Sequence, residues 1–378
     1  MNSQNPLHVQ ELLDNTIDFL SDSPATLLSC SIVARSWVYA AQSNLFRAPH
    51  VTTEAFFNHR TGIEREFCDV LTESPHLLRH VRELFIEEDD GDPEGVIARL
   101  CRLPFPRLET LIVGINHPLR WSETFRPILS LRTLRTLDLS TGGGFSPCVY
   151  FLTLCPSIQH LRLHCSGEDE KTPVVPHTLP LVQLKSLSVY FSTETYAEER
   201  HRLDPVGFYP FDLSKLKALA ILTEYLVDLE TLPNDARVAS IQLLELNGLP
   251  SRRGVDLWGF TNLKILCLPF DHQLSNVCLT IATISTLPRL ETVLFAMGTS
   301  LLNFNRIERK SIQEIDEIMS SLTNIPNPVQ FEIRPTTLDA EKCLRAVFPL
   351  LVAKNKFGIV YRSLDMEESW RRELIDTL

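Results

Sequence analysis

No apolar stretch of this 378-residue chain is long enough to cross a membrane, which takes about 18 to 20 consecutive apolar residues in a helix. The first residues also lack the basic segment and apolar run of a secretory signal. None of the asparagines begins an Asn-x-Ser/Thr site for N-linked glycosylation. Together these absences predict a soluble protein of the cytoplasm, the nucleus or both, with no membrane partner.

An excess of basic residues is absent as well. The chain has 36 Lys and Arg residues against 47 Asp and Glu, a formal net charge of −11. A surface that wraps nucleic acid or anionic lipid must be basic to displace counterions, so this balance argues against both partners. The hydrophobic fraction of 44% and the charged fraction of 22% are close to those of ordinary folded proteins. A protein partner or a neutral ligand fits this composition better.

The nine cysteines include no Cys-x-x-Cys pair, and their number is odd. Closely paired cysteines are the usual mark of structural zinc sites, so we expect buried free thiols, no bound metal and no cofactor. His160, His164 and Cys165 are close in sequence. Alternation along a strand would direct Cys165 to the opposite face, however, so these three residues do not predict a metal site.

Motifs of common enzymes are missing too. The sequence contains no GxxxxGK[ST], GxGxxG, HExxH or GxSxG pattern. The run TGGGFSP at 141–147 lacks the Lys-Ser/Thr of a phosphate-binding loop and is interpreted as a turn after a strand. We therefore expect a binding protein rather than an enzyme.

The first fifty residues have the spacing of three short helices. Over 9–20 apolar residues recur every three or four positions, the period of a helix with one buried face. Ser23 followed by Pro24 is typical of a helix start, so we expect a second helix over 25–37 and a third over 38–46. Four side chains of the second helix are expected to face inward: Leu27, Leu28, Ile32 and Trp37. So small a module buries little surface alone, which indicates docking on a partner or on the following domain.

Three blocks of this region resemble an F-box in sequence and spacing, particularly the form common in fungal F-box proteins: ELLDNTIDFL from residue 11, LLSCSIVARSW from 27 and NLF from 44. The resemblance covers residues 6–47. The family usually has Leu-Pro three and two residues before the glutamate, where this chain has His8 and Val9, and Leu7 lies one position early. An F-box binds the Skp adaptor of a cullin–RING ubiquitin ligase, so the resemblance implies that partner.

The resemblance also assigns roles to individual residues by matching positions. It implies that nine residues lie at or near the adaptor contact: Leu7, Val9, Glu11, Leu12, Leu13, Ile17, Leu20, Leu27 and Leu28. It implies that four others hold the module together: Arg35, Trp37, Leu45 and Phe46. The alternative for the same helices is a cap that shields the following domain and binds no adaptor.

The rest of the chain repeats a short pattern, apolar-x-x-apolar-x-apolar. It occurs in nine blocks, at 81–86, 108–113, 134–139, 158–163, 184–189, 216–221, 241–246, 263–268 and 290–295. The blocks are roughly 26 residues apart, which is the period of leucine-rich repeats. Each repeat is interpreted as a strand, a loop and a return segment whose apolar residues share a core with the next repeat. Two alternating segments around Phe331 and Ile359 are expected to extend the sheet, and 365–378 to form a capping helix with Trp370 and Leu374 inward.

The predicted fold class is therefore α/β: a short N-terminal three-helix F-box-like module, residues 1–50, a helical linker, 51–78, and an irregular leucine-rich-repeat-like solenoid, 79–378. Alternation along each strand places the third, fifth and seventh positions of a block on an exposed, concave face. That face is polar in the first repeats and apolar in the later ones. We expect the apolar part to be covered by the chain's own C-terminal segment or by a partner. Seven residues are the candidate partner contacts: Asp138, His160, Arg162, His164, Tyr190, Leu243 and Ile265.

These features predict a non-enzymatic adapter that docks the Skp adaptor through its helices and an unknown target protein through its repeats. Such a protein acts by proximity, because tethering raises the effective concentration of the target near the ligase. The alternative is a leucine-rich-repeat scaffold without a ubiquitin-ligase role.

Overall fold

The computed structural model describes residues 10–52, 61–88, 95–116, 118–142, 148, 151–166, 182–191, 211–222, 239–246, 254–270, 274–297, 306–323, 325–333 and 338–361. The predicted C-terminal helix, Leu7, Val9 and most of the 141–147 turn lie outside these residues. The chain divides into two compact units, the first comprising Met1–Leu163 with Asp169–Pro176 and the second His164–Glu168 with His177–Leu378.

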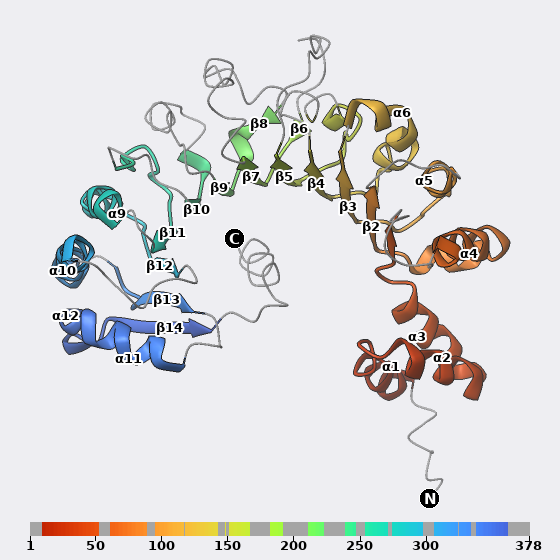
Figure 1. Cartoon of the computed structure of the whole chain (residues 1–378), viewed down its shortest axis with the longest axis horizontal. Helices are drawn as coiled ribbons and strands as arrows, with labels where there is room; N and C mark the ends of the chain where they lie inside the picture. Colours follow the sequence, from red (N-terminus) through yellow and green to blue (C-terminus); the bar gives the residue numbers. More distant parts are fainter. Residues whose placement is uncertain are drawn as a thin grey trace, which may run out of the picture. The chain divides into compact units, whose positions relative to one another are not determined.

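Three helices begin the first unit (Figure 1): α1 Gln10–Asp18, α2 Pro24–Val33 and α3 Arg35–Leu45. The prediction of three short helices is confirmed, but α2 ends at Val33 rather than Trp37. Ala34 adopts an extended conformation, with φ −151° and ψ 147°, and so separates the two helices. Trp37 consequently belongs to α3, where it packs partly buried against the module's core.

The prediction of the inward face of α2 was wrong for two of its side chains. Leu27 is 1% exposed, whereas Leu28 is 59% and Ile32 85% exposed. Leu27 and Cys30 are three residues apart and share the buried face, while Leu28 and Ile32 are four apart and share another face. Because both faces of this helix are apolar, the spacing of apolar residues alone did not identify the buried one.

The segment between the module and the first predicted repeat contains the expected helices, α4 Thr61–Glu73 and the 3₁₀ helix η2 Pro75–His80. It also begins with a strand that was not expected, β1 His50–Thr52. β1 pairs in parallel with β2, so that Val51 lies opposite Ile86. The last residues of the module therefore lead directly into the sheet.

The main strands belong to a twelve-stranded parallel sheet in the order β1-β2-β3-β4-β5-β7-β9-β10-β11-β12-β13-β14. All nine predicted blocks form strands, and each strand begins two residues after the start of its block. These are β2 Glu83–Glu88, β3 Thr110–Ile115, β4 Thr136–Thr141, β5 His160–Cys165, β7 Ser186–Phe191, β9 Ala218–Leu222, β10 Leu243–Leu246, β11 Ile265–Phe270 and β12 Thr292–Met297. The two expected extensions are also strands, β13 Val329–Ile333 and β14 Phe357–Tyr361. A separate two-stranded sheet pairs β6 Val182–Gln183 with β8 Phe211–Asp212.

Backbone hydrogen bonds repeat from strand to strand just before each strand begins. The carbonyl of Arg82 accepts the N–H groups of Glu109 and Thr110 at 2.8 and 3.0 Å, and the carbonyl of Glu109 accepts those of Arg135 and Thr136 at 2.8 and 3.0 Å. In the described part of the chain, eight carbonyls accept two consecutive N–H groups in this way: those of Arg47, Arg82, Glu109, Arg135, Lys185, Lys217, Gln242 and Lys264. We call this pattern the carbonyl ladder. It gives hydrogen-bond acceptors to the backbone N–H groups at the start of these strands.

Helices form the return segments of both units. In the first unit they are α5 Val96–Leu100 and α6 Pro118–Leu129. In the second they are α9 Leu274–Ile281, α10 Arg306–Ser321, α11 Leu338–Val347 and α12 Pro349–Ala353, with the 3₁₀ helices η3 Leu213–Lys215 and η6 Ile284–Thr286. Figure 1 shows α9 to α12 along one side of the strands of the second unit.

The core lies between the strands and these return segments. The central residue of every block, from Leu84 to Val293, is at most 3% exposed. In the second unit the core is aromatic: the ring of Phe331 lies 5.3 Å from that of Phe295, 4.6 Å from that of Phe348 and 5.0 Å from that of Phe357. Asp316 of α10 is 2% exposed, and its two carboxylate oxygens each accept a backbone N–H, from Leu350 and Leu351, at 2.9 Å. This carboxylate joins α10 to the first turn of α12.

Candidate functional site

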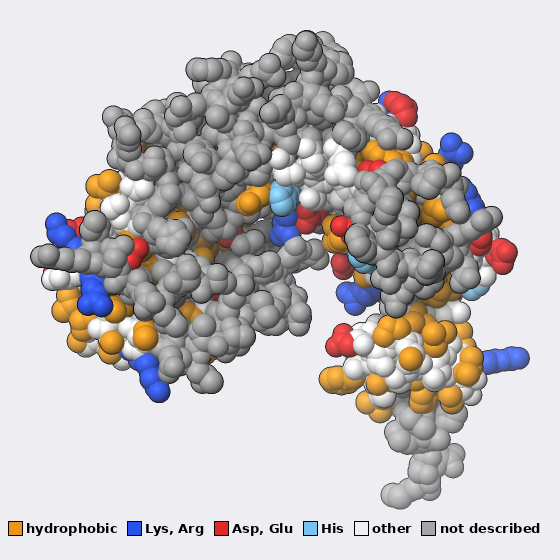
Figure 2. All heavy atoms as spheres, viewed as in Figure 1, with side chains coloured by type: hydrophobic (Ala, Val, Ile, Leu, Met, Phe, Trp, Pro, Cys, Tyr) orange, Lys and Arg blue, Asp and Glu red, His pale blue; other side chains and the backbone are white. Residues whose placement is uncertain are grey.

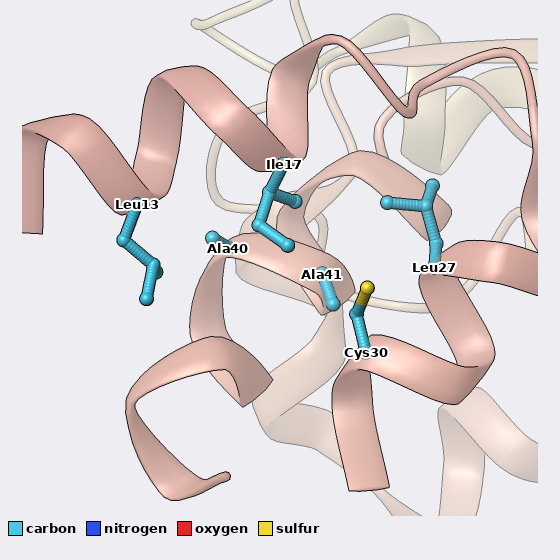
Figure 3. Packing of buried hydrophobic residues seen from close by; sticks show 6 residues of the cluster. All are labelled: Leu13, Ile17, Leu27, Cys30, Ala40 and Ala41. Atoms are coloured by element: carbon cyan, nitrogen blue, oxygen red, sulfur yellow. The ribbon is translucent and has the colours of Figure 1, made fainter. Parts of the chain in front are cut away.

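The three-helix module has a small core of its own. Leu13 and Ile17 of α1 point toward Ala40 and Ala41 of α3, and Leu27 and Cys30 of α2 complete the cluster (Figure 3). Leu20, Trp37 and Leu45 pack against it and are partly buried. Asp18 accepts a hydrogen bond from the side-chain amide of Asn44 at 2.9 Å, which connects α1 to α3.

The predicted adaptor residues fall into two groups in the structure. Leu13, Ile17 and Leu27 are at most 3% exposed and lie in the module's own core. Glu11, Leu12 and Leu28 are exposed. Of the nine residues assigned by the resemblance, only these last three are exposed among the residues the structure describes.

Other apolar side chains of α1 and α2 are exposed that the adaptor assignment did not include. Phe19 is 90% exposed and Val33 68%. With Leu12 at 51%, Leu28 at 59% and Ile32 at 85%, they form a set that we call the apolar surface of the module. Figure 2 shows hydrophobic side chains gathered on this module with few charged ones among them. Exposed apolar side chains at this density usually mark a site of protein interaction.

The end of α3 contacts the helical segment that follows the module, α4 and η2. The ring of Tyr39 meets that of His80 edge-on at 5.0 Å, and the Arg79 guanidinium lies 5.3 Å from the centre of the Tyr39 ring. Phe46 stacks on Phe67 of α4 with the ring centres 6.2 Å apart. Burial, followed by the charge of Arg79, lowers the pKa of His80, whose Nε2 accepts a hydrogen bond from Arg79 Nε at 3.3 Å. His80 therefore stays neutral at neutral pH, as this hydrogen bond requires.

The strand face that was predicted to be concave is accessible in the first unit. Along β2 the side chains of Glu83, Phe85 and Glu87 are half-buried, while those between them are buried. His50 of β1 packs edge-on against Phe85, with the ring centres 4.0 Å apart. We call this side of the strands the open face.

Two of the predicted contact residues form an ion pair on the open face. Nη1 of Arg162 lies 3.1 Å from Oδ2 of Asp138, and their side chains are 29% and 19% exposed. His160 is half-buried on the same side of β5. The structure thus places Asp138, His160 and Arg162 on one face, as the alternation of the strands predicts.

His164 and Tyr190, which belong to the second unit, also lie together. Their rings meet edge-on at 4.2 Å, and Tyr190 is 39% exposed. Burial lowers the pKa of His164. Cys165 is fully buried on the opposite face of β5. Within the described residues no group of three His, Cys, Asp or Glu side chains is placed to hold a metal ion.

The corresponding strand face is buried in the later strands of the second unit. Leu243 is 3% exposed, and Ile265 is half-buried. The register of the strands aligns four further residues of this face, Ala220, Glu245, Cys267 and Leu294, in a single row. All four are between 2% and 8% exposed. We call this row of side chains on β9 to β12 the covered face, because they are buried.

All nine cysteines are among the described residues, and none forms a disulfide bond; only Cys343 is exposed. No helix in the described part of the chain is both long and apolar enough to cross a membrane.

Comparisons with known proteins yield little. No protein-family model matches the sequence, and no curated protein matches it. A structural search finds a leucine-rich-repeat protein of Leptospira interrogans that is 13% identical, with 75% of this chain and 73% of that chain covered and a TM-score of 0.29. Likeness at this level carries no argument about the function of the present chain.

Proposed function

We propose that this protein is a substrate-recruiting adapter of a cullin–RING ubiquitin ligase, with an F-box-like module joined to a leucine-rich-repeat-like array. The helices α1 and α2 would dock on the Skp adaptor, and the array would hold a target protein. The observation that supports this most is the apolar surface of the module, where Phe19, Leu28 and Ile32 are more than half exposed although the module has its own closed core.

A module with a closed core does not need these side chains for folding. Each exposed leucine, isoleucine or phenylalanine gives up about 1.5 to 3 kcal/mol that full burial would provide. A partner surface would recover that free energy. In this proposal Leu13, Ile17 and Leu27 do not touch the adaptor. They support the contact indirectly, because they hold the three helices together in the module's core.

The open face of the first unit is the proposed place for the target. It combines the Asp138–Arg162 pair with the aromatic ring of Phe85 and the carboxylates of Glu83 and Glu87. Mixed polar and aromatic surfaces of this kind suit reversible protein recognition. The chain would contribute no chemistry of its own, only proximity.

Binding of the purified Skp adaptor to the full chain tests the proposal, for example by isothermal titration calorimetry. Leu28→Glu and Ile32→Glu place a charge in the apolar surface and are expected to weaken binding by about tenfold or more. Ser36→Glu is the matched control: it adds the same charge at an exposed position of α3 and is expected to leave the affinity unchanged. Circular dichroism confirms that each variant folds.

Binding that is equally strong in Leu28→Glu, Ile32→Glu and Ser36→Glu would show that the adaptor does not use this surface. No binding of the full chain at micromolar concentration would reject the ligase role.

A second candidate function, a scaffold whose helices only cap the array, is favoured by the contacts of Tyr39 and Phe46 with η2 and α4, the helices that lead into the array. A cap predicts that Tyr39→Ala lowers the stability of the array. An adapter predicts that Leu28→Glu weakens adaptor binding whatever Tyr39→Ala does.

A further inference from the structure

The last strand of the sheet, β14, is an edge strand. It pairs in parallel with β13 on one side, and none of the described strands pairs with its other side (Figure 1). Its last two residues, Val360 and Tyr361, are 39% and 57% exposed, whereas Phe331 of β13 is fully buried. The sheet therefore does not close at β14 within the described part of the chain.

The sequence of β14 lacks the features that normally keep an edge strand from pairing. Proteins protect such edges with charged residues, with proline or by making the edge strand very short. β1, at the other end of the strand order, is only three residues long. β14 has five residues, FGIVY, with no charge and no proline. Its composition is suited to pairing with another strand.

The lysines just before β14 are directed elsewhere. Nζ of Lys354 donates a hydrogen bond to the carbonyl of Ser320 at 3.0 Å, and Nζ of Lys356 donates one to the carbonyl of Leu322. Both ammonium groups thus bind carbonyls at the end of α10. The two lysines that could have protected the edge by their charge contact the neighbouring return segment instead.

Two side chains of β14 are held by α11. The hydroxyl of Tyr361 donates to Oε2 of Glu341 at 2.8 Å, and Nε of Arg345 donates to Oε1 of the same carboxylate at 2.8 Å. The Arg345 guanidinium also lies 5.1 Å from the centre of the Phe357 ring. Because the acid and the base neutralise each other, this pair adds no net charge beside the strand.

The pairing with β13 fixes which backbone groups of β14 face outward. The N–H of Val329 donates to the carbonyl of Lys356 at 2.7 Å. Successive residues of a strand direct their backbone groups alternately to its two sides, so Gly358 and Val360 bond to β13. The other three residues direct their N–H and carbonyl groups to the outer edge: Phe357, Ile359 and Tyr361. Among the described residues, none forms a hydrogen bond with these outward groups.

An antiparallel second copy of β14 matches these outward groups. With a two-fold axis at Ile359, this residue faces Ile359 of the second copy, and Phe357 faces Tyr361 of the second copy. In an antiparallel ladder such pairs exchange two hydrogen bonds each, and they are the pairs whose backbone groups point outward here. Between them Gly358 faces Val360 of the second copy, a small residue opposite a larger one. The aromatic pair is favourable, and no like charges meet.

We propose that β14 is a dimerisation edge, on which a second copy of this chain adds its own β14 in antiparallel orientation about a two-fold axis at Ile359. Such an interface uses the same residues on both copies and closes at two chains. The dimer carries two helical modules and two open faces, so it would bind a target with two recognition segments more tightly than one chain does. The proposal goes beyond the adapter function and holds whether or not the helical module binds a Skp adaptor.

Sedimentation velocity of the full chain over a range of concentrations tests the proposal. A pair of five-residue strands buries less area than a standard interface, so we expect dimers with a dissociation constant on the order of 10 μM. A chain that stays monomeric up to about 200 μM would overturn the proposal, because that is well above the affinity of even weak interfaces. A mass that grows beyond the dimer would also overturn it, because the contact would then not close.

Hydrogen exchange of the wild-type chain, resolved to single amides, locates the contact without any substitution. The amides of Phe357, Ile359 and Tyr361 are expected to exchange more slowly as the protein concentration rises. Those of Gly358 and Val360 bond to β13 already and are expected to stay unchanged. Protection of the outward amides that does not depend on concentration would overturn the proposal, since a segment of the same chain would then cover the edge.

Charges at the two-fold axis give an independent decision. Ile359→Lys and Ile359→Glu each place two like charges opposite one another and are expected to weaken dimerisation by about tenfold or more. An equimolar mixture of the two variants brings a lysine opposite a glutamate and is expected to restore dimers of unlike chains. Leu279→Lys and Leu279→Glu, at a position of α9 that is 53% exposed, are the matched controls and are expected to dimerise as the wild type does.

Restoration in the mixture excludes misfolding as the cause of the loss in the single variants. Circular dichroism checks the fold of each variant separately. Folded Ile359 variants that dimerise as strongly as the wild type would overturn the proposal. Folded variants that fail to pair with each other in the mixture would overturn it as well.

Discussion

The two units use the same strand geometry but treat the side of the strands away from the return helices differently. In the first unit this side carries Glu83, Phe85 and Asp138, which remain in contact with water. In the second unit Leu243, Cys267 and Leu294 occupy it and are buried. The backbone arrangement therefore does not decide whether the face is a surface or an interior. The side chains at alternate positions differ between the two units: Glu83 and Asp138 are charged, whereas Leu243 and Leu294 are apolar.

The largest effect on stability is expected in the core of the second unit. Phe331 is fully buried, and its ring contacts those of Phe295, Phe348 and Phe357. Phe331→Ala is expected to lower the free energy of unfolding by about 3 to 5 kcal/mol. Denaturant unfolding followed by hydrogen exchange would measure the loss and locate it. Equal loss of protection in β2 to β4 would contradict the division into two units.

A matched pair of substitutions compares the two faces directly. Cys267→Asp puts a carboxylate on the covered face and is expected to destabilise the protein by about 3 kcal/mol, because the charge is buried. Ser140→Asp puts the same group on the open face, where the side chain is exposed, and is expected to change stability by less than about 0.5 kcal/mol. Midpoints of urea unfolding measure both. Similar values for the two variants would remove the distinction between the faces.

A smaller effect on stability is expected where Asp316 joins α10 to α12 in the second unit. Asp316→Ala removes the acceptor of the N–H groups of Leu350 and Leu351. Hydrogen bonds to a charged group contribute about 1.5 to 3 kcal/mol, and a loss of this size is expected in thermal unfolding. Asp316→Asn keeps one acceptor oxygen and is expected to lose less. A loss as large in Asn as in Ala would show that charge rather than geometry matters here.

The smallest effect is expected on the open face. A double-mutant cycle with Asp138→Ala and Arg162→Ala is expected to give a coupling of less than about 1 kcal/mol, since both side chains remain in contact with solvent. Chemical unfolding of the two single variants and the double variant gives this number. A coupling of several kcal/mol would mean that this pair is buried in solution.

Most strands could be predicted because the leucine pattern is strong. All nine blocks, and the segments around Phe331 and Ile359, form strands of the sheet. β1 was missed, since His50–Thr52 is only three residues long and has no leucine pattern. The carbonyl ladder has no sequence signature either, because it uses backbone groups only.

The candidate sites were predictable in part. Alternation placed Asp138, His160 and Arg162 on one face, but the ion pair between the first and last of these depends on how neighbouring strands align. The exposure of Leu28 and Ile32 could not be read from spacing, because α2 has apolar residues on two of its faces. Burial of Glu245 was also unexpected, since a lone glutamate in an apolar row gives no sign of what faces it.

The first rung of the carbonyl ladder belongs to the helical module. The carbonyl of Arg47, just after α3, accepts the N–H groups of Arg82 and Glu83 at 2.9 and 3.0 Å. A chain that begins after residue 50 would therefore start its sheet with two amide hydrogens that have lost their acceptor. Another three-helix unit at this position would keep the two hydrogen bonds only if it placed a carbonyl where that of Arg47 lies.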